Sequence, residues 1–263
     1  MIFNLPNDDT RKVIAVALSL CLVCALLVST AAVYLRPLQE INKTLDMKKN
    51  ILDVAGLLQP GTDINKTFAA RIEIRAVDFS TGQFTDAVDP TAYDQKAASR
   101  DPAMSKELAR EVDVASVKRR ADYGLVYLLK DGETLKQLIV PVHGYGLWST
   151  MYGFIAIEPD LNTLAGIKFY QHGETPGLGG EIDNPAWQAK WVGKQLRYPD
   201  GDVALRVVKG VVITDNTNEQ YPVDDVSGAS RAGSASPQYQ IDGLSGASLT
   251  GNGVSNMLQF WLG

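Results

Sequence analysis

The sequence predicts an α+β protein in which an N-terminal transmembrane helix precedes a soluble domain built around an antiparallel sheet. Three observations lead to this fold class. A long apolar run without charges lies near the start of the chain, short β-type runs separated by Gly- and Asp-rich turns fill its second half, and apolar residues at helical spacing occupy its end.

The membrane helix is predicted over residues 13–35, behind a polar stub of residues 1–12. The run from Val13 to Leu35 carries no charge, and at ~1.5 Å per residue it is long enough for a hydrocarbon core of roughly 30 Å. An unusually long or uncleaved signal sequence is the alternative interpretation. Basic residues flank both ends of the run, so the positive-inside rule does not favour a cytoplasmic N-terminus: Arg11 and Lys12 precede it, and Arg36, Lys43, Lys48 and Lys49 follow it.

A membrane-proximal segment of mixed pattern is predicted over residues 36–120. The helix is expected to continue through Gln39–Asn50, and Pro60-Gly61-Thr62 marks a break. Charged helical stretches are expected near Met104 to Arg120.

Strand patterns dominate after residue 120. They cover 123–129, 137–142, 153–157, 164–169 and 205–213, and the Asp131-Gly132 pair between the first two is a hairpin signal. Successive hairpins predict an antiparallel sheet in a domain that covers residues 121–263.

Composition excludes several classes of function. The net charge of −5 does not suit a nucleic-acid-binding face. Cys21 and Cys24 lie in the apolar run, where we interpret them as small packing residues. Only His143 and His172 supply imidazoles, so we expect no metal centre.

The most informative motif is the turn D-G-L-S-G-A-S-L-T at 242–250. Its small residues and hydroxyls stand before a predicted helix that carries apolar residues at helical spacing, with Asn252 or Thr250 as the expected N-cap; the apolar positions are Val254, Met257, Leu258, Trp261 and Leu262. A turn of small residues that opens a helix suits a phosphate, since free N–H groups and the positive dipole end face it. A serine hydroxyl there can also carry a phosphate covalently.

This motif resembles the flavinylation motif of membrane-anchored FMN proteins, and the closest resemblance is to the C subunit of the sodium-translocating NADH:quinone reductase. The stretches H-G-Y-G-L-W-S-T-M-Y-G at 143–153, G-E-T-P-G-L-G-G-E-I at 173–182 and V-V-K-G at 207–210 agree with that family. The resemblance covers most of the chain and is weakest between about residues 50 and 120. In this family the chain commonly continues beyond the W-L-G at 261–263.

The resemblance implies FMN held by a phosphoester. The family's acceptor is normally threonine, and Ser248 stands at that position here, with Thr250 as the fallback acceptor. A second copy of the pattern, at 224–230, is interpreted as a loop because no helix pattern follows it.

Further cofactor contacts follow from the same resemblance. We expect Glu174 and Thr175 to offer polar contacts to the flavin ring, Leu178 an apolar one, and Gly177 and Gly179 a close backbone approach. Trp148 is expected to pack near the ring, and Ser149 and Thr150 to offer hydrogen bonds. Lys209 is expected to offset phosphate or reduced-flavin charge. The turn residues Asp242, Gly243, Leu244, Ser245, Gly246 and Ala247 complete the set. Each feature also has a plainer interpretation: a structural turn for the glycine-rich loop, a core position for the tryptophan, and a solvated side chain for the lysine.

The resemblance also implies a partly closed antiparallel sheet flanked by helices, and an electron carrier in a sodium-pumping NADH:ubiquinone oxidoreductase. Other membrane subunits of the complex, and a flavin transferase for maturation, are the implied partners. The implied location is the bacterial inner membrane, with the domain in the periplasm. Two alternatives remain: the G subunit of the related ferredoxin:NAD oxidoreductase complex, and a non-enzymatic membrane-tethered scaffold whose S-G-A-S is only a turn.

Overall fold

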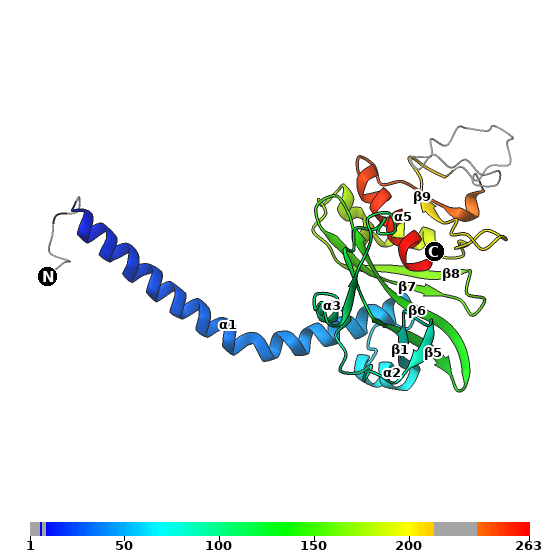
Figure 1. Cartoon of the computed structure of the whole chain (residues 1–263), viewed down its shortest axis with the longest axis horizontal. Helices are drawn as coiled ribbons and strands as arrows, with labels where there is room; N and C mark the ends of the chain where they lie inside the picture. Colours follow the sequence, from blue (N-terminus) through cyan, green and yellow to red (C-terminus); the bar gives the residue numbers. More distant parts are fainter. Residues whose placement is uncertain (1–5, 7–8, 213–235) are drawn as a thin grey trace. The chain divides into compact units, whose positions relative to one another are not determined.

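The computed structural model describes residues 6, 9–212 and 236–263 (Figure 1). The chain divides into two compact units, with the division between Met47 and Lys48. The second copy of the S-G-A-S pattern, at 224–230, lies outside the described residues. The functional boundary predicted near residue 120 stays a prediction.

The first element is one long helix, α1 (Thr10–Val54), which confirms the predicted helix over both 13–35 and 39–50. It is long and apolar enough to cross a membrane. Hydroxyls within it bond to the carbonyl four residues back, as Ser19 does to Ala15 and Ser29 to Ala25, so these polar groups are satisfied without water. The helix ends where Gly56, at φ +70°, donates to the Asp53 carbonyl, and the predicted break at 60–62 follows.

A six-stranded antiparallel sheet forms the centre of the second unit, in the order β2-β1-β5-β6-β7-β8. The strands are β1 (Ile72–Asp78), β2 (Gln83–Thr85), β5 (Tyr123–Asp131), β6 (Thr134–Tyr145), β7 (Thr150–Ile157) and β8 (Leu164–Gln171). Four of the predicted strands are therefore confirmed. Asp131 pairs with Thr134 across a turn in which Gly132 has φ +59°, which confirms the hairpin.

The remaining elements are short, apart from the last helix. They are α2 (Ile64–Arg71), α3 (Gln95–Ala98), β3 (Ser105–Glu107), β4 (Arg119–Ala121), η2 (Gly179–Asp183), α4 (Pro185–Gln188), η3 (Ala189–Trp191), β9 (Arg206–Val207), η4 (Pro237–Tyr239), β10 (Gln240–Ile241) and α5 (Ser248–Leu262). The predicted α+β class is confirmed.

The sheet has two differently packed faces. On one face, α5 packs against β6, and its buried Val254, Met257 and Leu258 join a core that includes Met151 and Ile155 of β7 (Figure 1). The other face is aromatic: the Tyr127 ring lies 5.9 Å from Phe154 and 6.5 Å from Phe68 of α2, measured between ring centroids. Alternation along the strands separates these two sets.

The helical stretches predicted near Met104 to Arg120 are wrong. The segment forms β3, turns and β4, because the Asp113 carboxylate accepts the amides of Val117 and Lys118 and holds the backbone in a turn. Ser116 and Lys118 have φ of 54° and 69°, values that an α-helix does not contain. Charge density without an apolar stripe was a poor helix signal.

The strand predicted over 205–213 is also mostly wrong. Only Arg206–Val207 form a strand, which pairs in parallel with Gln240–Ile241. The described residues beyond it, 208–212, form no strand. This short pairing nevertheless brings the V-V-K-G segment beside the turn that leads into α5.

Candidate functional site

The S-G-A-S turn delivers Ser248 to the first position of α5. The helix begins at Ser248 with Ala247 as N-cap, so the expected capping by Asn252 or Thr250 is wrong: both lie inside the helix. The chain reverses at Gly246, whose φ is +69°, a conformation that glycine adopts without strain. Ser248 is exposed, as are Ser245 and Gly246, whereas Leu244 and Ala247 are buried beneath the turn.

The N-terminus of α5 carries no side-chain cap. Gly251 donates to the Ala247 carbonyl, so the earlier amides of the first turn have no intrahelical acceptor. Those amides, together with the positive end of the helix dipole, lie beside the Ser248 hydroxyl. This arrangement suits a phosphate group.

Asp242 holds the start of the turn through contacts with three residues from other parts of the chain. Its carboxylate accepts the Val212 amide at 2.6 Å and pairs with Lys190, and its carbonyl accepts the Trp187 indole N–H at 2.8 Å. Burial acts to raise the pKa of this carboxyl, but the Lys190 and Val212 contacts outweigh burial and the pKa is lowered. The neighbouring Gly243 amide donates to the Gly210 carbonyl at 2.6 Å, and a Cβ on Gly243 would lie 2.4 Å from the Val208 carbonyl oxygen.

Glu174 is buried, and its carboxylate is directed at protein groups. It accepts backbone amides from Trp148 at 2.9 Å, Leu147 at 3.1 Å and Ser149 at 3.3 Å. It also accepts the Thr250 hydroxyl at 2.6 Å. Burial acts to raise the pKa of Glu174, but the Thr250 hydroxyl and the three amides lower it by more, so the pKa lies below its usual range.

Thr250, the fallback acceptor, is enclosed. Its side chain is fully buried, and its hydroxyl is engaged by Glu174. A Cβ on Gly179 would lie 2.5 Å from the Thr250 hydroxyl oxygen, so the glycine-rich loop closes directly over this group. Of the two hydroxyls, therefore, only that of Ser248 is exposed.

A second set of hydrogen bonds orders the loop before Glu174. The Ser149 hydroxyl accepts the Gly173 amide at 2.6 Å. The His172 ring accepts the Glu174 amide on Nδ1 and lies 2.7 Å from the Asp183 carboxylate through Nε2, which assigns the proton to Nε2. Sequence reasoning missed His172 and Asp183, because their pairing depends on how the loop folds back.

The remaining predicted residues lie on the surface around these loops. Trp148 is 65% exposed, which contradicts the plainer interpretation of it as a core residue, and Leu178 and Leu249 are 44% and 60% exposed. Leu178 reaches toward the S-G-A-S turn, since a Cβ on Gly246 would lie 3.1 Å from its Cδ2. Thr175, Gly177 and Lys209 are also exposed.

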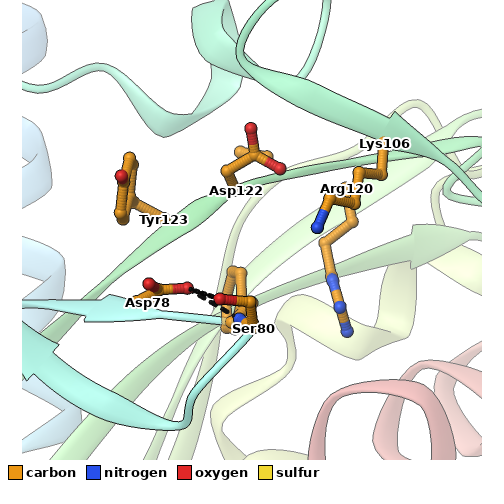
Figure 2. Close-up of a pocket in the computed structure, with 8 residues that line it drawn as sticks. Asp78, Ser80, Lys106, Arg120, Asp122 and Tyr123 are labelled. Atoms are coloured by element: carbon orange, nitrogen blue, oxygen red, sulfur yellow. Dashed lines mark hydrogen bonds between the residues drawn. The ribbon is translucent and has the colours of Figure 1, made fainter.

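A separate cavity of about 180 Å³ lies where β1, β4 and β5 meet (Figure 2). It contains none of the residues predicted to bind FMN; its lining is Asp78, Phe79, Ser80, Lys106, Arg120, Ala121, Asp122 and Tyr123. Across the described ranges, no group of three or more His, Cys, Asp and Glu side chains is placed to hold a metal ion.

Comparison with known proteins gives the family. The model of the FMN-binding domain matches residues 146–263. The C subunit of the Na⁺-translocating NADH-quinone reductase of Pseudomonas aeruginosa is 47% identical over 260 residues, which cover 98% of this chain and 93% of the relative. The corresponding Vibrio anguillarum protein is 48% identical, over 98% of this chain and 92% of its own. This chain belongs to the C-subunit family of that reductase.

Solved structures agree with that assignment. The crystal structure of Shewanella oneidensis NqrC superimposes with a TM-score of 0.71 at 32% identity, over 84% of this chain and 93% of that one. The homologous reductase subunit from Parabacteroides distasonis gives a TM-score of 0.60 at 26% identity, over 86% and 92%. These matches support an FMN-carrying subunit of a sodium-translocating NADH:quinone reductase, and they lend no support to the ferredoxin:NAD oxidoreductase alternative.

Proposed function

We propose that this member of the C-subunit family carries FMN as a phosphoester on Ser248 and relays electrons within a sodium-translocating NADH:quinone reductase. One observation carries the proposal: Ser248 is exposed at the uncapped N-terminus of α5, whereas the nearby Thr250 hydroxyl is buried against Glu174. The resulting phosphoprotein would hold FMN by its tail and leave the ring free. Bound FMN supplies reversible electron transfer, and the protein supplies attachment, orientation and electrostatics.

The residues around Ser248 fit the parts of the flavin. The first-turn amides suit the phosphate, and Lys209, exposed on the segment beside the turn, suits its charge. Trp148, Leu178 and Leu249 offer exposed apolar contacts for the isoalloxazine, with Thr175 and Gly177 in the same loop as Leu178. Ser149 and Glu174 order the loops beneath these contacts, while Gly243, Leu244, Ser245, Gly246 and Ala247 form the turn that Asp242 anchors.

Attachment joins the Ser248 hydroxyl oxygen to the flavin phosphorus while the hydroxyl loses its proton. The donor is a flavin dinucleotide bound by a flavin transferase. Its phosphoanhydride bond breaks, the nucleoside monophosphate leaves with the proton from Ser248, and the phosphoryl group that carries riboflavin stays on Ser248. The other partners in this proposal are the membrane subunits of the same complex. Residues 13–35 span the bacterial inner membrane, and residues 121–263 form the FMN-binding domain on the periplasmic side.

The test is peptide mass spectrometry of the full chain after co-expression with a flavin transferase. We expect the peptide that contains residues 242–250 to gain the mass of FMN less water, with fragmentation placing the adduct on Ser248. Ser248→Ala should abolish the adduct, Ser248→Thr should keep it, and Ser80→Ala, which changes a distant exposed serine, should be silent.

An adduct on Thr250 in the Ser248→Ala variant would contradict the proposed acceptor. A protein that stays colourless with either serine or threonine at position 248 would contradict the flavoprotein function and favour the scaffold alternative.

A further inference from the structure

Three chain segments meet at the Glu174 carboxylate. The loop after β6 contributes the amides of residues 147–149, and α5 contributes the Thr250 hydroxyl at 2.6 Å. Glu174 itself opens the glycine-rich loop that contains Leu178 and Gly179. The partners lie 27 and 76 residues away along the chain, so this one side chain fixes segments that local structure does not connect.

The backbone is packed tightly around this carboxylate. A Cβ on Gly146 would lie 2.6 Å from Glu174 Oε1, and one on Gly179 would lie 2.9 Å from Oε2. Hydrogen bonds to an ionised acceptor are stronger and more directional than neutral ones, and a buried carboxylate requires them. The site is therefore built around a negative charge, which holds the backbone of Trp148 directly and begins the loop that carries Leu178.

We propose that Glu174 is a positioning residue for the flavin, which sets the orientation of Trp148 and Leu178 relative to Ser248 without touching FMN itself. The inference rests on the proposed attachment of FMN to Ser248. Both carboxylate oxygens are occupied by protein donors, so the role of Glu174 passes through the loops that it holds. A ring tethered only by its phosphate would otherwise sample several orientations.

The chemistry of the acceptor makes the role specific to a carboxylate. Glutamine has nearly the same shape, but only one of its two terminal atoms accepts hydrogen bonds, and its amide nitrogen would face donors. Glu174→Gln therefore keeps the volume and breaks the set of contacts. Thr250→Val removes only the hydroxyl contact, and Thr250→Ser keeps that hydroxyl.

The experiment compares the wild type, Glu174→Gln, Thr250→Val and Thr250→Ser as full chains. Glu73→Gln, which changes a carboxylate on β1 that pairs with Arg75 of the same strand and Lys130 of β5, is the matched control. Amide hydrogen exchange on the apo-proteins measures loop order without flavin. Co-expression with the transferase then gives the rate of FMN attachment, the flavin midpoint potential and the visible circular dichroism of the ring.

We expect Glu174→Gln to speed amide exchange over residues 146–150, with the sheet still protected, and to slow attachment by roughly tenfold, the loss expected for one charge-assisted hydrogen bond. Its ring dichroism and midpoint potential should both change. Thr250→Val should show the same effects in weaker form, and Thr250→Ser and Glu73→Gln should match the wild type.

Each other outcome decides against the inference in its own way. Unchanged exchange in both Glu174→Gln and Thr250→Val would show that the contacts do not order the loops. Faster exchange with unchanged attachment, potential and dichroism would reduce Glu174 to a structural role. If the two variants exchange faster but the wild type itself never takes up FMN, the loop contacts are real and the proposed function is refuted. There is then no flavin for Glu174 to position.

Discussion

The two ends of α5 are held in place by different interactions. At the C-terminal end, the Trp261 ring lies 4.8 Å from His143 and 6.0 Å from Phe79, measured between centroids, and its indole donates to the His143 carbonyl. At the N-terminal end, Thr250 is held by a carboxylate, and Ser248 is left open. The C-terminal end is therefore held by aromatic packing together with hydrogen bonds, which include one from the Arg197 guanidinium to the Leu262 carbonyl, whereas the N-terminal end is held through the buried Glu174 carboxylate and keeps an exposed hydroxyl.

The largest expected effect on stability comes from the C-terminal end of α5, where Trp261 packs. Trp261→Ala should lower the free energy of unfolding by about 3 kcal/mol, because it removes a large ring and leaves the His143 carbonyl without its donor. Thermal or denaturant unfolding measures this. FMN attachment at temperatures where the variant is folded should be unchanged, and a large loss of attachment there would show that the two ends are coupled.

As the pH falls, the contacts of His143 at the C-terminal end of α5 should lose stability first. Burial, with a smaller contribution from Lys96, lowers the pKa of His143 from 6.5 to about 4, against an opposing effect of Asp113. The unfolded chain therefore takes up this proton before the folded one, and stability falls as the pH drops from about 6.5 to about 4, by roughly 2–3 kcal/mol. His143→Phe should flatten the pH dependence in that window, and an unchanged slope would mean that another group titrates there.

The Glu174 contacts at the N-terminal end of α5 should be lost only at lower pH. Because the folded-state pKa of Glu174 is depressed, its contribution is complete above the unfolded pKa of about 4.3 and is lost as the pH falls through the folded value. Hydrogen exchange over residues 146–150 at successive pH values separates this window from that of His143. Coincident transitions at the two ends would contradict the separation.

Gly179→Ala should disrupt the contact between Glu174 and Thr250 by steric conflict. The new methyl would lie 2.5 Å from the Thr250 hydroxyl oxygen, so the glycine-rich loop or α5 must shift, at a cost of about 2 kcal/mol. We expect reduced FMN attachment with an intact sheet, as measured by mass spectrometry and far-UV circular dichroism. Gly193→Ala provides a comparison away from the Glu174 contacts: its φ of +78° makes alanine unfavourable there without any clash, so it should lower stability but leave FMN attachment unchanged.

The smallest effect is expected at the anchor of the turn. Asp242→Asn weakens the pair with Lys190, whose side chain is about half exposed, and should cost about 1 kcal/mol, with a smaller difference in high salt. Unfolding at two salt concentrations measures this effect. A cost that does not change with salt would indicate that the Val212 amide contact matters more than the ion pair.

The sequence predicted the strands and the helix whose residues show a regular apolar spacing. The β-branched and aromatic runs after residue 120 identified four sheet strands, and the apolar spacing from Val254 to Leu262 identified α5. The segment 104–120 was mispredicted because the hydrogen bonds of Asp113 to two amides leave no periodic trace in the sequence.

The sequence named candidate residues for the site but did not predict how they are arranged. The sequence placed the N-cap at Asn252 or Thr250 and so put Ser248 before the helix, whereas the structure begins α5 at Ser248. The direction of the Glu174 carboxylate, inward to Thr250 rather than outward, depends on contacts between distant segments. The burial of the second hydroxyl follows from the same contact, so it could not be inferred from a motif in which Ser248 and Thr250 look alike.

The edges of the sheet have a consequence for solubility. One edge ends in β2, only three residues long, and beside it β1 carries Glu73 and Arg75, which pair with each other. At the other edge, η2, α4 and η3 lie along β8, and the Leu164 amide and carbonyl bond to Lys194 and Gly193. Neither edge offers a long, flat template to a neighbouring molecule, which disfavours edge-to-edge pairing between copies of the chain.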